Sequence, residues 1–180
     1  MMILITGGSK CGKSAAAEAI LDGFEGDKFY IAAMEPFGDE AKKAIERHRV
    51  MRQGKGFITI ERSHNIDTLV IPCERTGSCA LLECLTTLCA NEMFTQEEIT
   101  DPSEKILRGL KSLSEQVEKL VVVTNEVASD GLEYPSGTSE YIRIMSQLNN
   151  AAAQFADVVI ECVCGTVSYT HLRAHETRSN

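Results

Sequence analysis

The sequence predicts an α/β fold, in which a doubly wound, mostly parallel β-sheet carries helices on both faces. Short aliphatic runs rich in β-branched residues alternate with segments whose apolar residues recur at helical spacing, and this alternation is typical of such folds. The chain has 180 residues, of which 43% are hydrophobic and 24% charged, enough for one domain with a full core. We therefore expect a single domain over residues 1–165, followed by an atypical tail over 166–180.

The first half of the chain is predicted to contain three strands with helices between them. The run MMILIT has the aliphatic, β-branched character of a buried parallel strand, and an alanine-rich segment that suits a helix follows it at 14–24. A second helix is expected because acidic residues open the segment 38–54 and basic residues close it, as the helix dipole favours. The remaining elements are strands at 27–34 and 56–63, and a short helix and turn at 65–78.

The second half continues this alternation. Residues 79–94 begin as a buried strand and become polar at Glu83, and a polar linker follows. Apolar residues at helical spacing predict a helix at 103–120, with Ser103 as its N-terminal cap. The remaining elements are a strand at 121–127, a loop rich in turn formers, a helix at 138–156 and a last strand at 157–165.

The segment between the first strand and the first helix matches the phosphate-binding pattern G-x-x-x-x-G-K-[ST]. The glycines allow successive backbone N–H groups to face phosphate oxygens, and the following helix directs the positive end of its dipole to the same place. Lys13 is expected to reach the β- and γ-phosphates, and the Ser14 hydroxyl to ligate Mg²⁺. The fold is therefore expected to be of the P-loop NTPase type, with residues 1–165 as a nucleotide-binding, catalytic domain. The residues expected to bind nucleotide here are Gly7, Gly8, Ser9, Lys10, Cys11, Gly12, Lys13 and Ser14.

Several further candidates fall at the carboxyl ends of the predicted strands, where ligands of such sheets bind. An acidic residue that ends an apolar strand can orient Mg²⁺ or its water, and Glu83 is the candidate for that role. A polar strand terminus without a function is the alternative for Glu83. The other candidates at this edge are Ala33, Met34 and the run Thr124-Asn125-Glu126.

Composition argues against several classes of protein. The net charge of −8 disfavours a nucleic-acid backbone as the main partner. No apolar run approaches the roughly 20 residues of a membrane span, and the N-terminus carries no secretion signal. Seven cysteines without an export signal indicate a reducing compartment, so we expect a cytoplasmic protein. A base-reading N-K-x-D motif is missing, which argues against a regulatory GTPase and leaves a small-molecule kinase as the default.

A second cluster, ERHRVMR at 46–52, combines a histidine with arginines. On a helix Arg49 and Arg52 lie three residues apart on one face, and His48 lies one turn from Arg52. Neighbouring cations keep an imidazole neutral, so that it can attack phosphorus while the arginines neutralise phosphate oxygens. The alternative is a solvated basic helix end with an incidental histidine, and the residues alone favour that alternative.

Several motifs follow one another along the chain, and they are MILITGGSKCGKS at 2–14, FYIAAM at 29–34, DEAKKAIERHRVMR at 39–52, TIE at 59–61, LLECLTTLCAN at 81–91, VVVTNEV at 121–127 and LNNAAAQFADVVIECVCG at 148–165. With these motifs in this order, the chain resembles the adenosylcobinamide kinase / adenosylcobinamide-phosphate guanylyltransferase family. The resemblance covers most of the chain to about residue 165. It implies that the aminopropanol hydroxyl of adenosylcobinamide is phosphorylated, and that GMP is then transferred from GTP to that phosphate with release of pyrophosphate.

The resemblance also implies roles for individual residues, and it reverses the interpretation of the basic cluster. It implies that His48 is guanylylated as a covalent intermediate, and that Arg49 and Arg52 hold the GTP phosphates or the departing pyrophosphate. Asn91 is a further candidate, for positioning the corrinoid side chain. The implied cofactor is Mg²⁺, the substrates are adenosylcobinamide, GTP and ATP, and the assembly is a homo-oligomer, often a trimer. Four strand-terminal positions match residues that contact the nucleotide or its metal, and they are Ala33, Met34, Glu61 and Glu83.

The chain departs from the family pattern at three places. Ala128 stands where glycine is common, and PSGTSEYIRIM at 135–145 replaces a usual acceptor-side segment. The tail at 166–180 does not match the family's usual final strand, so we expect it to be non-native or disordered, and His171 and His175 then carry no metal prediction. A P-loop small-molecule kinase without nucleotidyl transfer and a non-catalytic nucleotide-binding module stay as alternatives.

Overall fold

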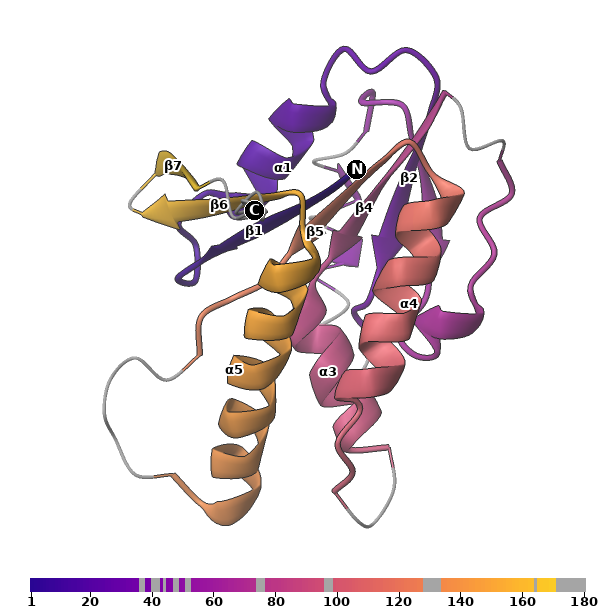
Figure 1. Cartoon of the computed structure of the whole chain (residues 1–180). Helices are drawn as coiled ribbons and strands as arrows, with labels where there is room; N and C mark the ends of the chain where they lie inside the picture. Colours follow the sequence, from indigo (N-terminus) through magenta and orange to yellow (C-terminus); the bar gives the residue numbers. More distant parts are fainter. Residues whose placement is uncertain are drawn as a thin grey trace, which may run out of the picture.

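The structure, a computed structural model, describes residues 1–35, 38–39, 43, 45–46, 49–50, 53–73, 77–95, 99–127, 134–163 and 165–170. Within these residues seven strands form one sheet in the order β3-β2-β4-β5-β1-β6-β7 (Figure 1). Every neighbouring pair from β3 to β6 is parallel, and β7 pairs with β6 in the antiparallel direction. The predicted α/β fold with a mostly parallel sheet is confirmed.

The strand that leads into the glycine-rich segment lies in the middle of the sheet. Strand β1 lies between β5 and β6, and its residues are buried because both faces of the sheet are covered there. The strands are β1 (Met2–Gly7), β2 (Asp27–Ala32), β3 (Phe57–Glu61), β4 (Ser78–Glu83), β5 (Lys119–Val123), β6 (Val158–Val163) and β7 (Thr166–Thr170). Their carboxyl ends, apart from that of β7, therefore meet at one edge.

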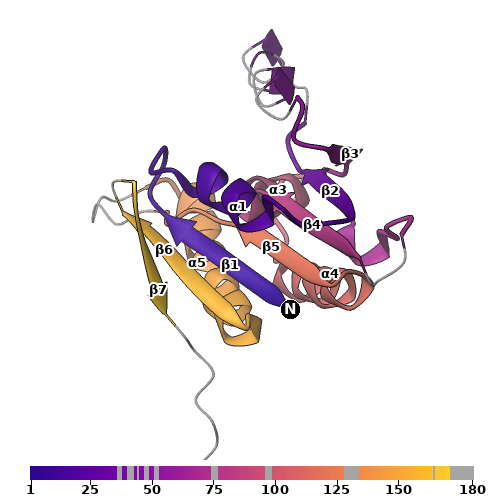
Figure 2. The ribbon, with the colours of Figure 1, turned by 90° about the horizontal axis from the view of Figure 1, so that it is seen from above.

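Helices cover both faces of the sheet (Figure 2). Helix α1 packs into one cluster of buried residues, while α3, α4 and α5 pack into the other. The helices are α1 (Lys13–Leu21), the 3₁₀ helix η1 (Ile66–Thr68), α3 (Leu85–Met93), α4 (Ser103–Gln116) and α5 (Ser136–Phe155). None of the helices in the described part of the chain is long and apolar enough to cross a membrane.

Helix α3 was not predicted from the sequence. The segment that begins as a buried strand ends that strand at Glu83, and α3 starts two residues later. Its buried residues Leu85, Leu88, Cys89 and Met93 recur at helical spacing, but the preceding strand hides the change of period. A second boundary also differs from the prediction, because α4 ends at Gln116 and β5 begins at Lys119, which pairs with Cys79 of β4, while the pairing with β1 begins at Leu120.

The first residues of the tail form a strand. Residues Thr166–Thr170 make up β7, which pairs with β6, and the expectation of a non-native or disordered tail over 166–180 stays a prediction. Gly165 has φ +78°, a conformation that suits a tight turn between antiparallel strands. The run TVSYT has the β-branched and aromatic residues that strands prefer. His171 and His175 of the tail lie outside the described residues.

The buried cysteines behave as small hydrophobic side chains. Burial raises the pKa of Cys79 to about 11 and that of Cys89 to about 12, so both thiols are neutral at pH 7. All six cysteines in the described part of the chain are free. They contribute packing to the two core clusters and no covalent cross-link.

Helix α4 contacts η1 so closely that Gly109 has no room for a side chain. A Cβ atom there would lie 2.5 Å from Ile66 Cγ1 and 2.8 Å from the backbone nitrogen of Asp67.

Alanine stabilises a helix interior by about 1 kcal/mol over glycine, but overpacking costs about 1–3 kcal/mol. The net cost is about 0–2 kcal/mol. Because one of the close atoms is a backbone nitrogen, we expect Gly109→Ala to lower the free energy of unfolding by about 2 kcal/mol, measured by urea denaturation with circular dichroism. Gly137→Ala is the matched control, because its Cβ would come no nearer than 3.4 Å to a neighbour. A Gly109→Ala variant as stable as the Gly137→Ala variant would contradict this account.

Candidate active site

The glycine-rich segment forms a curled loop between β1 and α1. Its backbone adopts positive φ at Gly7 (+141°), Lys10 (+59°) and Gly12 (+99°), and glycine permits this at two of the three positions. Gly12 is the N-cap of α1 and supplies no side-chain cap. The first N–H groups of the helix therefore have no side-chain partner from the cap and suit an anion.

Lys13 lies inside this loop. Its side chain is buried, with 6% of the residue exposed. The ammonium donates hydrogen bonds to the carbonyl oxygens of Gly7, at 3.0 Å, and of Gly8. A buried ammonium needs hydrogen-bond acceptors, and the two carbonyls supply them. They keep the positive charge inside the loop, where the motif predicts that phosphate oxygens bind. Lys13 therefore lies inside the loop, and its predicted contact with the β- and γ-phosphates stays a prediction.

Glu83 is joined to the loop across the sheet. The Ser14 hydroxyl donates to Glu83 Oε1, and the Tyr30 hydroxyl donates to Glu83 Oε2 at 2.7 Å. Since β5 lies between β1 and β4, this contact spans one intervening strand. Ser14 and Glu83, the two residues predicted to hold a metal, therefore come together. Tyr30 was missed, because its position inside a buried strand gives no signal of a polar partner.

The end of β6 and the turn between β6 and β7 contact the glycine-rich loop and support it. Gly7 pairs with Cys162 in the β1–β6 ladder, and the Gly165 N–H donates to the Cys11 carbonyl at 3.1 Å. A Cβ on Gly7 would lie 2.3 Å from the carbonyl oxygen of Cys162. Burial raises the pKa of Cys162, so an uncharged thiol faces the loop. Sequence reasoning missed this support, and Gly165 was the signal that could have indicated a turn.

The strand-terminal candidates separate into two groups. Met34 and Glu83 line one cavity of about 90 Å³, together with Tyr30, Ala32, Ile45, Cys84 and Thr87. Glu61 lies level with Ala32 on the other side of β2, and its side chain is exposed. Ala33 is buried and donates its N–H to the Glu83 carbonyl at 3.1 Å. The structure therefore brings Met34 to the Glu83 carboxylate, and it leaves Ala33 and Glu61 outside this cavity.

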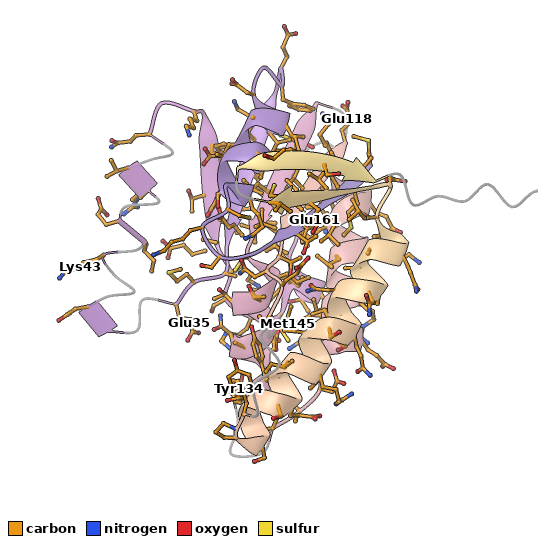
Figure 3. The ribbon with its side chains drawn as sticks, turned by 90° about the vertical axis from the view of Figure 1, so that its left-hand side faces the viewer. Glu35, Lys43, Glu118, Tyr134, Met145 and Glu161 are labelled. Atoms are coloured by element: carbon orange, nitrogen blue, oxygen red, sulfur yellow. The ribbon has the colours of Figure 1, made fainter. Side chains whose placement is uncertain are left out.

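The basic cluster lies mostly outside the described residues. His48 and Arg52 belong to the part of the chain that the structure does not describe, while Arg49 is helical with an exposed side chain. Lys43, from the same segment, stands away from the sheet, and Glu35 marks where the segment leaves β2 (Figure 3). The approach of His48 to the P-loop, implied by the resemblance, therefore stays a prediction.

Asn91 on α3 holds together the two loops that flank this segment. Its amide donates to the Ala33 carbonyl at 2.8 Å and to the Ser63 carbonyl at 3.1 Å. His64, in the second loop, has Nε2 at 3.1 Å from the Asn91 carbonyl and Nδ1 at 3.3 Å from Glu35 Oε1. Both amide N–H groups bind backbone carbonyls, so Asn91 links the two loops, and a role in positioning the corrinoid side chain stays a prediction.

The run after β5 also reaches the loop. Thr124 is buried and donates to Asn149 Oδ1 at 2.7 Å, Asn125 donates to the Thr86 hydroxyl at 2.8 Å, and the Glu126 N–H donates to the Gly7 carbonyl at 3.2 Å. Tyr141 donates to the Thr86 carbonyl at 3.1 Å. Burial raises the pKa of Tyr141 to about 12, so its hydroxyl keeps its proton for this bond.

Comparison with known proteins finds a family that matches this chain. The family model for cobinamide kinase / cobinamide phosphate guanyltransferase matches residues 3–169. The bifunctional adenosylcobalamin biosynthesis protein CobU of Escherichia coli (strain K12) is 32% identical over 92% of this chain and 97% of its own length. The protein of that name from Salmonella typhimurium is 30% identical over the same shares of both chains.

A comparison of structures supports the fold alone. An ATPase from the type III secretion system of pathogenic bacteria superposes with a TM-score of 0.52 at 8% identity, covering 89% of this chain and 50% of that chain. Such a likeness agrees with a P-loop α/β fold and says nothing of the substrate. The family match covers nearly the whole chain and includes every residue of the loop. The chain therefore belongs to the cobinamide kinase / cobinamide phosphate guanyltransferase family of bifunctional kinases and guanylyltransferases.

Proposed function

We propose that the protein phosphorylates the aminopropanol hydroxyl of adenosylcobinamide and then transfers GMP from GTP to adenosylcobinamide phosphate. The products of the second reaction are adenosylcobinamide-GDP and pyrophosphate. The observation that carries this proposal is the buried Lys13 inside the loop, beside a Ser14 hydroxyl that is bonded to Glu83. In a member of this family, we expect such an arrangement to bind nucleoside triphosphates, and the two proposed here are GTP and ATP.

We propose Mg²⁺ as the cofactor, and the oxygen atoms that meet at Ser14 and Glu83 fit it. Mg²⁺ prefers hydroxyl, carboxylate and phosphate oxygens, and the two side chains offer the first two kinds. When bound, Mg²⁺ neutralises charge on the phosphates. Lys13 exchanges its carbonyl partners for phosphate oxygens, the loop N–H groups bind the phosphates, and Tyr30 keeps the Glu83 carboxylate oriented.

For the second reaction we propose His48 as the nucleophile. A nitrogen of its neutral imidazole attacks the α-phosphorus of GTP, a N–P bond forms, and the P–O bond to pyrophosphate breaks. An oxygen of adenosylcobinamide phosphate then attacks the same phosphorus, and the N–P bond breaks to return the free histidine. Arg49 and Arg52 neutralise the phosphates or the departing pyrophosphate, and Ala33, Met34 and Glu61 contact the nucleotide. The sequence resemblance and the family match support these roles.

We also propose a homo-oligomer, a trimer by the family resemblance, in the cytoplasm. The free cysteines of the described residues agree with a reducing compartment.

The covalent step has a direct test. Incubation with GTP that carries ³²P at the α-phosphate is expected to label the protein through an acid-labile, base-stable bond, as a phosphoramidate requires. His48→Ala is expected to take no label, because it lacks the attacking nitrogen. Glu46→Ala, an exposed residue of the same segment, is the matched control and is expected to label normally. Undiminished label in His48→Ala would remove His48 from the mechanism, and γ-phosphate transfer without any label would leave a plain kinase.

A further inference from the structure

A second cavity lies on the opposite face of the sheet from α1, between the sheet and α5. Its volume is about 330 Å³. It opens at the carboxyl ends of β1 and β5, and it shares no lining residue with the cavity beside Glu83. Strand and helix both contribute to it: Thr6 and Leu4 come from β1, and Ser146, Asn149, Asn150 and Ala153 come from α5.

The lining combines an apolar floor with uncharged polar groups. Leu4, Val127, Ala153 and Val159 form the apolar part. The lining also includes the side chains of Thr6, Ser146 and Asn150, and the last two residues are exposed, so a ligand can reach their hydroxyl and amide groups. A concave, mostly apolar site with a few oriented polar groups is the usual form of a small-molecule site.

One wall of the cavity is held rigidly. Asn149 accepts a hydrogen bond from Thr124 at 2.7 Å and donates one to the Asn125 carbonyl at 3.1 Å. These bonds fix α5 to the end of β5, so the residues that follow on the helix are presented at a defined place. Asn150 and Ala153 lie next on α5 and face the cavity.

The lining of the cavity extends to the residue that precedes the phosphate-binding loop. Thr6 lines the cavity and directly precedes Gly7, and the Glu126 N–H donates to the Gly7 carbonyl at 3.2 Å. A ligand in the cavity would therefore lie next to the first residue of the loop. This is the relation that an acceptor must have to the phosphates held by Lys13.

The charge of the lining excludes a second triphosphate. Among its described residues, Glu126 carries the only formal charge, and that charge is negative. A polyanion would be repelled, whereas the hydroxyl or amide N–H of a neutral ligand could donate to the Glu126 carboxylate.

We propose that this cavity is the acceptor subsite and binds the neutral aminopropanol arm of the corrinoid, with its amides and hydroxyl. The inference rests on the proposed function, because that function supplies the acceptor. A cavity of about 330 Å³ is at the small end of the range for drug-sized ligands, about 300–1,000 Å³. The much larger corrin ring therefore stays outside while the arm enters. Asn150 and Ser146 bind the amide, and Thr6 and Glu126 bind the hydroxyl side.

Two variants test the assignment against a matched control. Asn150→Leu removes the amide at the mouth, and Ala153→Phe fills the cavity from the same helix. Gln154→Leu makes the same kind of change at an exposed amide of α5 that does not line the cavity. Each protein is assayed for label from α-³²P GTP without acceptor, for the KM of adenosylcobinamide in the phosphorylation reaction, and for binding of dicyanocobinamide by equilibrium dialysis. Circular dichroism checks that each variant is folded.

We expect Asn150→Leu and Ala153→Phe to raise the KM of adenosylcobinamide and the Kd of dicyanocobinamide by roughly 10-fold or more, while Gln154→Leu changes neither. The label from GTP reports a step without acceptor and separates the two proposals. If the wild-type protein takes no label, the guanylyl transfer fails, and the dialysis still tests the cavity. Folded Asn150→Leu and Ala153→Phe variants with unchanged KM and unchanged Kd would overturn the subsite.

Discussion

Replacing Lys13 with methionine is expected to lower both the phosphorylation of adenosylcobinamide and the guanylylation of the protein by about 10²–10³-fold. The ammonium is the buried positive charge of the loop and is already held by the carbonyls of Gly7 and Gly8. Methionine keeps most of the side-chain length and removes the charge, so the protein should fold while the phosphates lose their counter-charge. Initial rates with γ- and α-labelled GTP measure the two activities.

The control for this prediction is Lys55→Met. Lys55 pairs with Glu18 on α1 and is exposed, so the same loss of charge occurs near the helix and away from the loop. Exposed ion pairs contribute about 0–1 kcal/mol, and we expect this variant to keep nearly full activity. Equal rates for the Lys13→Met and wild-type proteins would show that the loop does not bind the reacting phosphates.

Replacing Gly7 with alanine is expected to lower the free energy of unfolding by about 3 kcal/mol or more, and to abolish nucleotide binding. Its φ of +141° is strained for any residue with a Cβ, at a cost of about 1–3 kcal/mol. In addition the Cβ would lie 2.3 Å from the carbonyl oxygen of Cys162, which belongs to the paired strand β6 and cannot move alone. Urea denaturation measures the first effect and equilibrium dialysis with GTP the second.

Gly8→Ala is the comparison that isolates the cause. Gly8 is the next residue, and a Cβ there would have nothing within 4 Å. We therefore expect Gly8→Ala to unfold at nearly the wild-type urea concentration. If the two alanine variants are equally stable, the contact between β1 and the end of β6 does not support the loop as described.

The sequence predicted the loop and its acidic partner because both depend on short-range patterns. A strand, a glycine-rich turn and a helix in direct succession specify the positions of Lys13 and Ser14. Glu83 could be placed opposite them because parallel strands bring their carboxyl ends to one edge. The contact between Ser14 and Glu83 is therefore a consequence of local pattern and one rule of topology.

What the sequence could not predict depends on the order of the strands. The pairing of Gly7 with Cys162 follows from β6 lying next to β1, and no local signal indicates which strand takes that place. The cavity under α5 arises in the same way, from residues that are far apart in the chain. Helix α3 was missed for a different reason, since only Glu83 separates the apolar run of β4 from the apolar residues that begin the helix.

The most direct test of the central claim is a single incubation with adenosylcobinamide in which the two phosphates are labelled differently. ATP and GTP carry ³³P at the γ-phosphate, and GTP also carries ³²P at the α-phosphate. If one chain performs both transfers, adenosylcobinamide-GDP contains both isotopes, with ³³P from the first reaction and ³²P from the second. A corrinoid product that carries ³³P alone, or no labelled corrinoid at all, would contradict the account.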